Sequence, residues 1–325
     1  MVWTPLHARV HRVLRARHLL ERRQAVLIAV SGGQDSLCLA KLLLDLQPKW
    51  GWTLGIAHLD HGWRSDSKAN ADYVEQLARD WQVPIYRETA TQVTTSEAAA
   101  RQWRYATLAN LAQTHHYTAL VTGHTASDRA ETLLYNLIRG SGADGLQALT
   151  WRRSLTPSVQ LVRPLLEVTR SETAAFCQEF RLKIWEDSTN YDTTYARNRI
   201  RQELLPYLKG VFNPQVEQAL AQTAELLQAE VDYLEQVTDQ MRQQVQHPER
   251  PGLNRSVLKS LPLAIQRRVV RQFLLGVMSS APNFDQIEKI VGLVTAPNRS
   301  RTDPIAGGTI ATVEDDWIWL VSQES

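Results

Sequence analysis

Residues Ala25–Ser36 read AVLIAVSGGQDS. The six apolar or small residues Ala25–Val30 predict a short buried strand, and the run that begins at Leu37 is compatible with a helix. Between them, the adjacent glycines Gly32 and Gly33 permit backbone angles that a β-carbon forbids and let backbone amides approach a ligand closely. These amides, together with the positive end of the following helix, form a concavity suited to phosphate.

The loop is not a Walker A sequence, because it lacks the lysine of GxxxxGK[ST]. Positive charge for a bound phosphate must come from elsewhere, most simply from Mg²⁺ held by Asp35. The complete string S-G-G-x-D-S, placed after an apolar strand, favours phosphate binding over an ordinary Gly-Gly turn. It resembles the PP-loop of ATP pyrophosphatases, which cleave ATP between the α and β phosphates and transfer AMP to an oxygen of the substrate. The resemblance implies an ATP site made of Ser31, Gly32, Gly33, Gln34, Asp35 and Ser36.

Strands and helices alternate along the first part of the chain. Further strands are predicted at 53–60, 84–88 and 119–123, and helices at 66–81, 96–114 and 127–139. Such alternation predicts an α/β fold with a parallel sheet covered by helices on both faces. Ligands bind at the carboxyl ends of such strands, so the loop 31–36 should converge with 58–64 and 124–128 on one crevice.

The length of 325 residues favours two domains over one. We expect a PP-loop catalytic domain at 1–210 and, at 211–325, a linker helix with a smaller, mainly helical domain. Asn213-Pro214 predicts the start of a long helix that reaches residue 246 and spans about 50 Å. The glycine-rich segment 139–146 predicts a mobile loop or lid, and 309–321 has strand character.

Composition narrows the class of protein. There is no run of eighteen apolar residues and no apolar core of a signal peptide near the N-terminus, so we expect no membrane partner and a cytoplasmic location. The cysteines Cys38 and Cys177 form no disulfide or metal framework. The net charge of +2 argues against a uniformly basic nucleic-acid binder, but arginines cluster at 9–23 and 197–201. The first cluster lies on a predicted amphipathic helix, which is either a solvated surface or an RNA contact.

Several longer strings follow one another along the first two hundred residues. They are SGGQDS (31–36), LDHGWR (59–64), EAAARQWRY (97–105), TGHTASDRAET (122–132), RGSGADGL (139–146) and EDSTNYDTTYARNRIR (186–201). Together they resemble the tRNA(Ile)-lysidine synthase family. The resemblance implies that ATP, with Mg²⁺, adenylates the C2 oxygen of the wobble cytidine in tRNA(Ile) with a CAU anticodon. Free L-lysine then displaces AMP through its ε-amine and gives lysidine, and a homodimer is left open.

Two acids and a cation are candidates for the chemistry. Asp128 and Glu131 are three residues apart on one face of a predicted helix, so both can point into the crevice toward the amines of lysine. A carboxylate nearby could accept the proton of the ε-ammonium. Arg101 is the candidate partner of the phosphates. Ser127 stands where the family more usually has the first acid of Thr-Ala-Asp-Asp. We therefore assign the binding of lysine to Asp128 and Glu131.

Basic side chains complete the predicted site. Arg197 and Arg201 are four residues apart on one helical face, and could hold the tRNA backbone or the phosphate of the activated cytidine. His58, near the end of its predicted strand, and His124, just after another, are assigned to the ATP site. The sequence supplies no convincing third and fourth ligands for a metal beside His58 and His61. Trp63 could stack on a splayed base.

Two other readings remain open. The chain could be another PP-loop adenylating enzyme that acts on tRNA or a small molecule, although a thiolase would need cysteines in a pattern such as CxxC, and a small-molecule synthetase would not need the arginine clusters. It could also be a noncatalytic tRNA-binding protein, which would tolerate the loss of Asp35.

Overall fold

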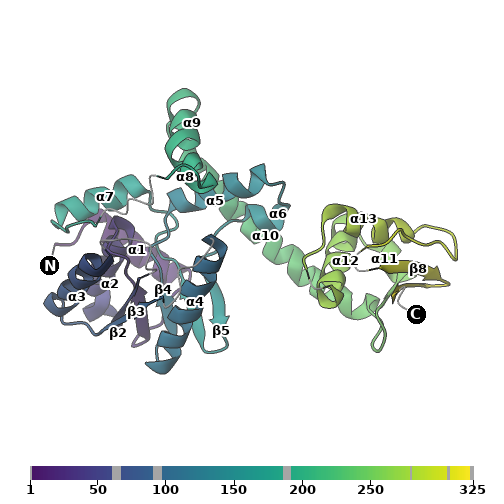
Figure 1. The fold of residues 1–325 in the computed structure, drawn as a ribbon, viewed down its shortest axis with the longest axis horizontal. Coiled ribbons are helices and arrows are strands. Elements are labelled where there is room, and N and C mark those ends of the chain that lie inside the picture. Colours follow the sequence, from purple (N-terminus) through teal and green to yellow (C-terminus); the bar gives the residue numbers. More distant parts are fainter. Residues whose placement is uncertain are drawn as a thin grey trace. The chain divides into compact units, whose positions relative to one another are not determined.

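The computed structural model describes residues 2–60, 67–90, 97–185, 192–278, 280–305 and 308–322 (Figure 1). The chain forms two compact units, Met1–Gln228 and Ala229–Ser325. The division falls within one long helix, α10 (Val216–Val245). The predicted domain boundary after residue 210 stays a prediction. Within the described ranges, no helix is long and apolar enough to cross a membrane.

The first unit contains a mostly parallel sheet of six strands, in the order β3-β2-β1-β4-β6-β5. The parallel strands are β1 (Ala25–Ala29), β2 (Thr53–Asp60), β3 (Ile85–Thr89), β4 (Ala119–Val121) and β6 (Val159–Val162). The edge strand β5 (Arg152–Thr156) runs antiparallel to β6. The predicted α/β fold is therefore confirmed. Strand β5 was not predicted, because its sequence RRSLT is polar and mostly exposed, as an edge strand allows.

Successive residues of the central strand β1 point to opposite faces of the sheet and pack into different cores. Val26 and Ile28 of β1 pack into the core beneath the helices α1 (Pro5–Ala16), α2 (Gln34–Trp50), α3 (Ser67–Asp80) and α7 (Arg170–Glu179). Leu27 points the other way, into a core formed with α4 (Glu97–Thr114). Because both faces are covered, β1 reads as a continuous apolar run rather than an alternating one.

Shorter helices extend the first unit beyond the sheet. They are α5 (Ala126–Ile138), α6 (Ala143–Leu146), α8 (Ala196–Arg199) and α9 (Leu205–Val211), with a π-helical turn at Ile200–Leu204. Ala130 and Leu134 of α5 pack against Ile200 and Leu205 in a small core. The segment 139–146, predicted as a loop or lid, contains α6, which the amide of Asn136 ties back through the carbonyl of Gly145.

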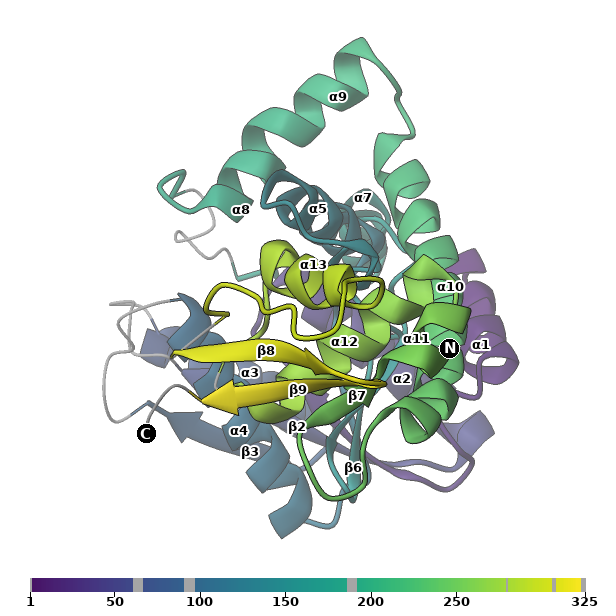
Figure 2. The same cartoon turned by 90° about the vertical axis from the view of Figure 1, so that its right-hand side faces the viewer.

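The second unit has a core of its own, which includes the buried Val269 and Phe273. It combines the C-terminal part of α10 with a small antiparallel sheet in the order β7-β9-β8 (Figure 2). Its elements after α10 are β7 (Gly252–Asn254), α11 (Arg255–Ser260), α12 (Leu263–Val277), α13 (Phe284–Leu293), β8 (Thr309–Glu314) and β9 (Trp317–Ser322). The predicted helical region and the strand character near the C-terminus are both present.

Candidate active site

The loop between β1 and α2 is held by its own serines. The backbone amide of Ser31 donates to Oγ of Ser36 over 3.1 Å, and the hydroxyl of Ser36 donates to the carbonyl of Gly33 over 2.8 Å. Gly32 has φ +89°, and a β-carbon there would lie 2.3 Å from Oδ1 of Asn70. The loop therefore needs glycine at position 32, and it leads directly into the N-terminus of α2, where backbone amides favour an anion.

One arginine joins three carboxylates beside this loop. Arg170, the first residue of α7, places Nε 3.2 Å from Asp35, Nη1 2.6 Å from Glu131 and Nη2 2.5 Å from Asp128. Thr169 caps α7 in a reciprocal capping box with Glu172, which fixes the direction in which the helix starts. The structure thus brings together Asp35, Asp128 and Glu131, which the sequence had assigned to different ligands.

A second arginine binds the same acids from another element. Arg201, in the π-helical turn, contacts both oxygens of Glu131, with Nε 2.8 Å and Nη2 2.9 Å away. The hydroxyl and backbone amide of Thr125 both donate to Oδ2 of Asp128 over 2.8 Å. All four oxygens of Asp128 and Glu131 therefore accept a hydrogen bond or ion pair. Three carboxylates face two guanidiniums in this cluster, so one formal negative charge is left over.

The environment separates the pKa values of the two aspartates. Burial, and then the charge of Asp128, raise the pKa of Asp35, against the opposing effect of Arg170. Burial also acts to raise the pKa of Asp128, but Arg170, His124 and the donors of Thr125 overcome it and lower that pKa to about 2. Asp128 consequently stays ionised and is a weak base.

The two histidines assigned to the ATP site are neutral near pH 7. Burial lowers the pKa of His124 to about 3, and its Nδ1 lies 2.8 Å from the hydroxyl of Thr122. Burial also lowers the pKa of His58, whose Nδ1 donates to the carbonyl of Val30 over 2.8 Å. Val30 directly precedes the loop. The hydrogen bond from His58 therefore fixes the backbone at the point where β1 leads into the loop.

Arg101 belongs to a separate basic cluster. Its guanidinium lies over the ring of Tyr105, 5.1 Å from the centroid, and Arg153 lies over the same ring at 5.0 Å. Burial acts to raise the pKa of the Tyr105 hydroxyl, but Arg101 and Arg163 outweigh this effect and lower it. Because Arg163 and Arg101 also act on His124, this cluster lies close to the end of β4.

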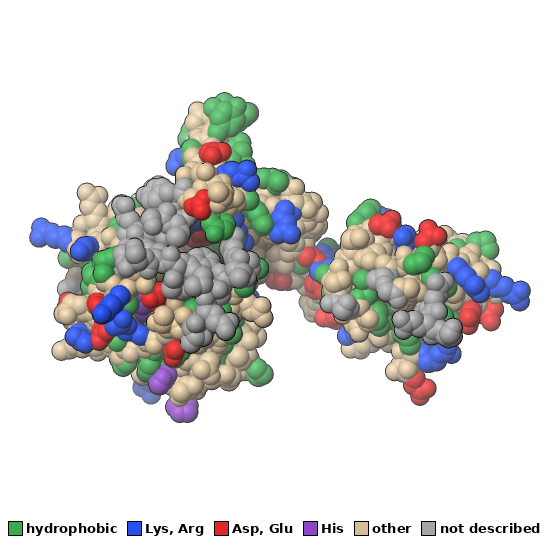
Figure 3. Space-filling view, viewed as in Figure 1, with side chains coloured by type: hydrophobic (Ala, Val, Ile, Leu, Met, Phe, Trp, Pro, Cys, Tyr) green, Lys and Arg blue, Asp and Glu red, His purple; other side chains and the backbone are tan. Residues whose placement is uncertain are grey.

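Arg197 and Arg201 both contact α5. The guanidinium of Arg197 lies 5.3 Å from the ring centroid of Tyr135, one helical turn beyond Glu131. Both arginines therefore contact side chains of α5, and Arg201, which was expected to bind RNA or phosphate, here binds an acid. On the face shown in Figure 3, Lys and Arg side chains are interspersed with acidic and hydrophobic ones.

Sequence reasoning missed Arg170 and Thr173. The hydroxyl of Thr173 donates to Asp35, and the amide of Gln34 donates to the carbonyl of Arg170 over 2.9 Å. The capping box of Thr169 and Glu172 is a local signal for the start of this helix, but nothing local indicates that the helix starts against the phosphate loop. Some predicted positions lie outside the described residues, namely Trp63, the first residue of the predicted helix 96–114 and the start of the string 186–201.

The residues around the loop could bind a metal ion together with a bound nucleotide, but they do not form a complete metal site by themselves. Among the described residues, no group of three or more His, Cys, Asp or Glu side chains could hold a metal ion. Mg²⁺ is commonly bound by one or two carboxylates together with substrate phosphates and water. Oδ1 of Asp35 accepts from Thr173 and, over 3.4 Å, from the side-chain amide of Gln34, whereas Oδ2, within the described part of the chain, accepts only from Arg170 and keeps a further lone pair. Asp35 therefore fits an ion that is shared with a bound nucleotide.

The parallel sheet and the loop at the carboxyl end of β1 define a PP-loop ATP-binding domain. The family pattern described as the PP-loop domain matches residues 5–208, and the TilS substrate binding domain matches residues 253–316. Two curated proteins match over nearly their full length. The chain belongs to the tRNA(Ile)-lysidine synthase family.

The two relatives carry the family's name. The tRNA(Ile)-lysidine synthase of a Nostoc species is 62% identical over 100% of this chain and 99% of its own length. That of a Synechocystis species is 50% identical over 99% of both chains. Among solved structures, the U34-tRNA thiolase NcsA from Methanococcus maripaludis superimposes with a TM-score of 0.57 at 18% identity, over 69% of this chain and 78% of that one. This last likeness concerns the fold alone.

Proposed function

We propose that this chain forms lysidine in tRNA(Ile) with a CAU anticodon. ATP adenylates the C2 oxygen of the wobble cytidine with release of pyrophosphate, and the ε-amine of L-lysine then displaces AMP. The observation that carries the proposal is the match to lysidine synthases over the whole chain, with a PP-loop and a carboxylate cluster side by side in its structure.

The loop and the start of α2 bind the phosphates of ATP. The backbone amides of the loop and of the first turn of α2 would bind the phosphates, while the hydroxyls of Ser31 and Ser36 hold the loop in shape through contacts with the Gly33 amide and carbonyl. Asp35 would hold Mg²⁺ shared with those phosphates, and the ion supplies positive charge that the loop, without a lysine, does not. The arginines around Tyr105 add positive charge close to His124.

Asp128 and Glu131 bind the ammonium of the substrate lysine. Their cluster has one negative charge to spare, but each of their oxygens already has a donor. Lysine therefore enters by taking the place of an existing donor, and Arg201, at the rim in the π-helical turn, is the donor that exchanges. With its pKa at about 2, Asp128 orients the ammonium rather than removing its proton.

The partners follow from the two matched domains. The TilS substrate binding domain at 253–316 supports tRNA(Ile) as the macromolecular substrate, and the PP-loop domain supports ATP. A homodimer and a cytoplasmic location stay predictions.

The test is nucleoside mass spectrometry of tRNA(Ile) after incubation with the protein, Mg-ATP and lysine. We expect lysidine at the wobble position, dependent on both ATP and lysine. Unmodified cytidine with ATP split to AMP and pyrophosphate would instead support another PP-loop adenylating enzyme.

A second experiment measures turnover and tRNA affinity of the variant Asp35→Ala. We expect turnover to be abolished while tRNA affinity is largely retained, because Asp35 lies at the phosphate loop. Retained turnover would overturn the assignment of Mg²⁺ to Asp35.

A further inference from the structure

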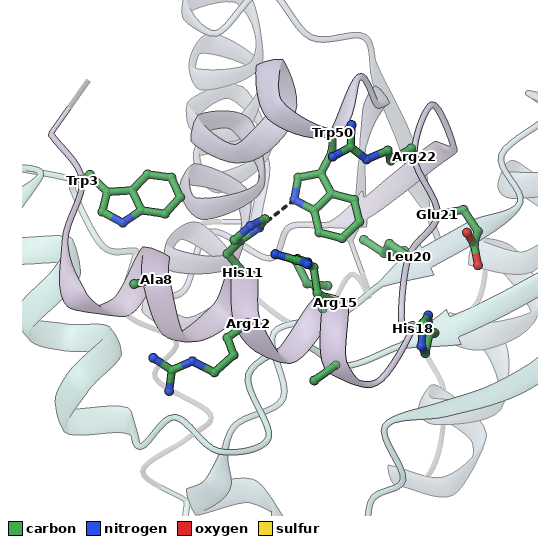
Figure 4. A pocket seen from close by; sticks show the side chains of 12 residues that line it. Trp3, Ala8, His11, Arg12, Arg15, His18, Leu20, Glu21, Arg22 and Trp50 are labelled. Atoms are coloured by element: carbon green, nitrogen blue, oxygen red, sulfur yellow. Dashed lines mark hydrogen bonds between the residues drawn. The ribbon is translucent and has the colours of Figure 1, made fainter.

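A groove of about 640 Å³ lies beside α1, outside the site described above (Figure 4). It is lined by residues of α1, of the segment that follows it and by Trp50, the last residue of α2. Because α2 begins at the phosphate loop, the groove lies about one helix length, roughly 25 Å, from that loop. A pocket of this volume suits a small organic group.

Aromatic rings form its walls. The indole Nε1 of Trp50 donates to Nδ1 of His11 over 3.1 Å. Trp3 approaches the other side of the same imidazole edge-on, with 6.2 Å between the ring centroids, and 45% of its surface is exposed. Figure 4 shows Trp3 and Trp50 on either side of His11. His7 stacks on this indole with 5.4 Å between the ring centroids, and the Lys49 ammonium lies over the ring, so a base can stack on Trp3 when Lys49 moves aside to a phosphate.

Cations surround the rings without acidic partners. Burial lowers the pKa of His11, and the charges of Lys49, Arg15 and Arg22 lower it further, so these three cations lie close to the imidazole. Lys49 also places its ammonium 5.2 Å from the ring centroid of Trp3. Across the part of the chain that the structure describes, none of these three cations forms an ion pair with a carboxylate.

Other arginines of the same segment behave differently. Arg9 pairs with Glu172 over 2.6 Å, and Arg17 pairs with Glu225 over 2.7 Å. The side of α1 that packs on the rest of the unit is therefore neutralised, whereas the groove is lined by Arg12, Arg15 and Arg22, with Lys49 close to its His11, and by a single acid, Glu21. The repulsion among these cations is relieved when an anion binds.

We propose that this groove is a second contact site for tRNA, in which Arg15, Arg22 and Lys49 hold backbone phosphates and an unpaired base stacks on Trp3. Lys and Arg contacts to phosphate supply affinity without reading sequence, and an aromatic ring beside them suits a base outside a duplex. The inference rests on the proposed function, because that function makes tRNA the substrate. A folded tRNA is longer than α2 and can reach from the loop to the groove.

The test compares Arg15→Ala/Arg22→Ala and Trp3→Ala with Arg79→Ala, which removes an exposed arginine of α3. All these side chains are exposed, so the substitutions leave the fold intact. Binding of tRNA(Ile) is measured at several salt concentrations, and lysidine formation in the steady state.

The two groove variants have distinct expected signatures. The double variant should bind tRNA about 10-fold more weakly, with the slope of log affinity against log salt reduced by about 2. Trp3→Ala should weaken binding by about 10-fold with the slope unchanged, because it removes stacking and no charge. In both, KM for tRNA should rise while kcat and the KM values for ATP and lysine stay constant. Arg79→Ala should match the wild type.

Two results would overturn the proposal. One is an unchanged tRNA affinity and salt slope in the double variant. The other is quenching of tryptophan fluorescence by AMP that Trp3→Ala abolishes while tRNA affinity is unaffected, since the groove would then take a free nucleotide. If the wild type makes no lysidine, the proposed function fails, but the affinity and slope still decide the role of the groove.

Discussion

Arg170 gives the acids of the site their geometry. Its three nitrogens contact Asp35, Asp128 and Glu131 at 3.2, 2.5 and 2.6 Å. Without a cation between them, these carboxylates would repel one another in a partly buried site. The planar guanidinium can serve three carboxylates at once, whereas an ammonium is a single point of charge.

We expect Arg170→Met to destabilise the fold by roughly 3 kcal/mol, because breaking a buried ion-pair cluster leaves carboxylates uncompensated. In that background, Asp128→Asn should be less destabilising than in the wild type, or even stabilising, because it relieves repulsion. Urea denaturation of the four proteins of this double-mutant cycle measures the difference. Equal effects of Asp128→Asn in both backgrounds would show that the two side chains are not coupled.

At the scale of elements, the end of β4 lies against the start of α2. A β-carbon on Gly123 would lie 2.8 Å from the carbonyl carbon and oxygen of Asp35, which are backbone atoms that cannot move aside cheaply. The strand and the helix therefore approach each other only because residue 123 has no side chain. This close approach sets the position of Asp35 relative to His124 and Asp128.

Gly123→Ala should lower stability by about 1–3 kcal/mol, as overpacking does, and should lower kcat by displacing Asp35. Gly210→Ala is the matched control, since Gly210 lies in α9 with nothing within 4 Å of an added β-carbon. The control should be neutral or slightly stabilising. Thermal unfolding and steady-state kinetics of both variants test this, and equal behaviour of the two would contradict the steric argument.

Two histidines with lowered pKa values make stability depend on pH. The pKa of His124 is about 3 in the folded protein and near 6.5 when unfolded. Between these values the unfolded chain binds a proton that the folded chain does not, so stability falls as the pH drops below 6.5, by at most about 1.4 kcal/mol per pH unit. His58, whose pKa is also lowered, acts in the same direction. His124→Gln should reduce the slope of melting temperature between pH 7 and 5, whereas His116→Asn, at an exposed turn, should leave it unchanged.

At the scale of the whole molecule, the second unit has a hydrophobic core of its own. Phe273 is 2% exposed in the core of the second unit, which shares no buried residue with the core beneath the phosphate loop. We therefore expect the packing of the second unit to be lost independently of that core.

Phe273→Ala should lower the free energy of unfolding of the second unit by about 3–5 kcal/mol, because it leaves a cavity in the core. Calorimetry should show one transition moved to lower temperature and a second that stays in place. Affinity for tRNA should fall while ATP affinity is retained, because the TilS substrate binding domain lies in the affected unit. A single transition that shifts as a whole would instead show that the two units unfold together.

Much of the first unit could be predicted from local patterns. The apolar run of β1, the capping box at Thr169 and the spacing of Asp128 and Glu131 all have a local physical cause, and the structure shows each of them. Strand β5 and the π-helical turn at Ile200–Leu204 could not be predicted, because tertiary contacts decide them. The same holds for the site: the spacing of the acids is local, but their shared partner Arg170 approaches from an element about forty residues away in sequence.

Whether an acid is tolerated at position 127 depends on the residue at position 217. The hydroxyl of Ser127 donates to Glu217 over 2.5 Å and accepts from the backbone amide of Arg170 over 3.2 Å. An aspartate at 127 would bring a carboxylate against Glu217, so Ser127→Asp is tolerated only after Glu217 has become neutral. The two positions are therefore epistatic. We expect Glu217→Gln to make Ser127→Asp tolerable, which the stabilities of the two single variants and the double variant would show.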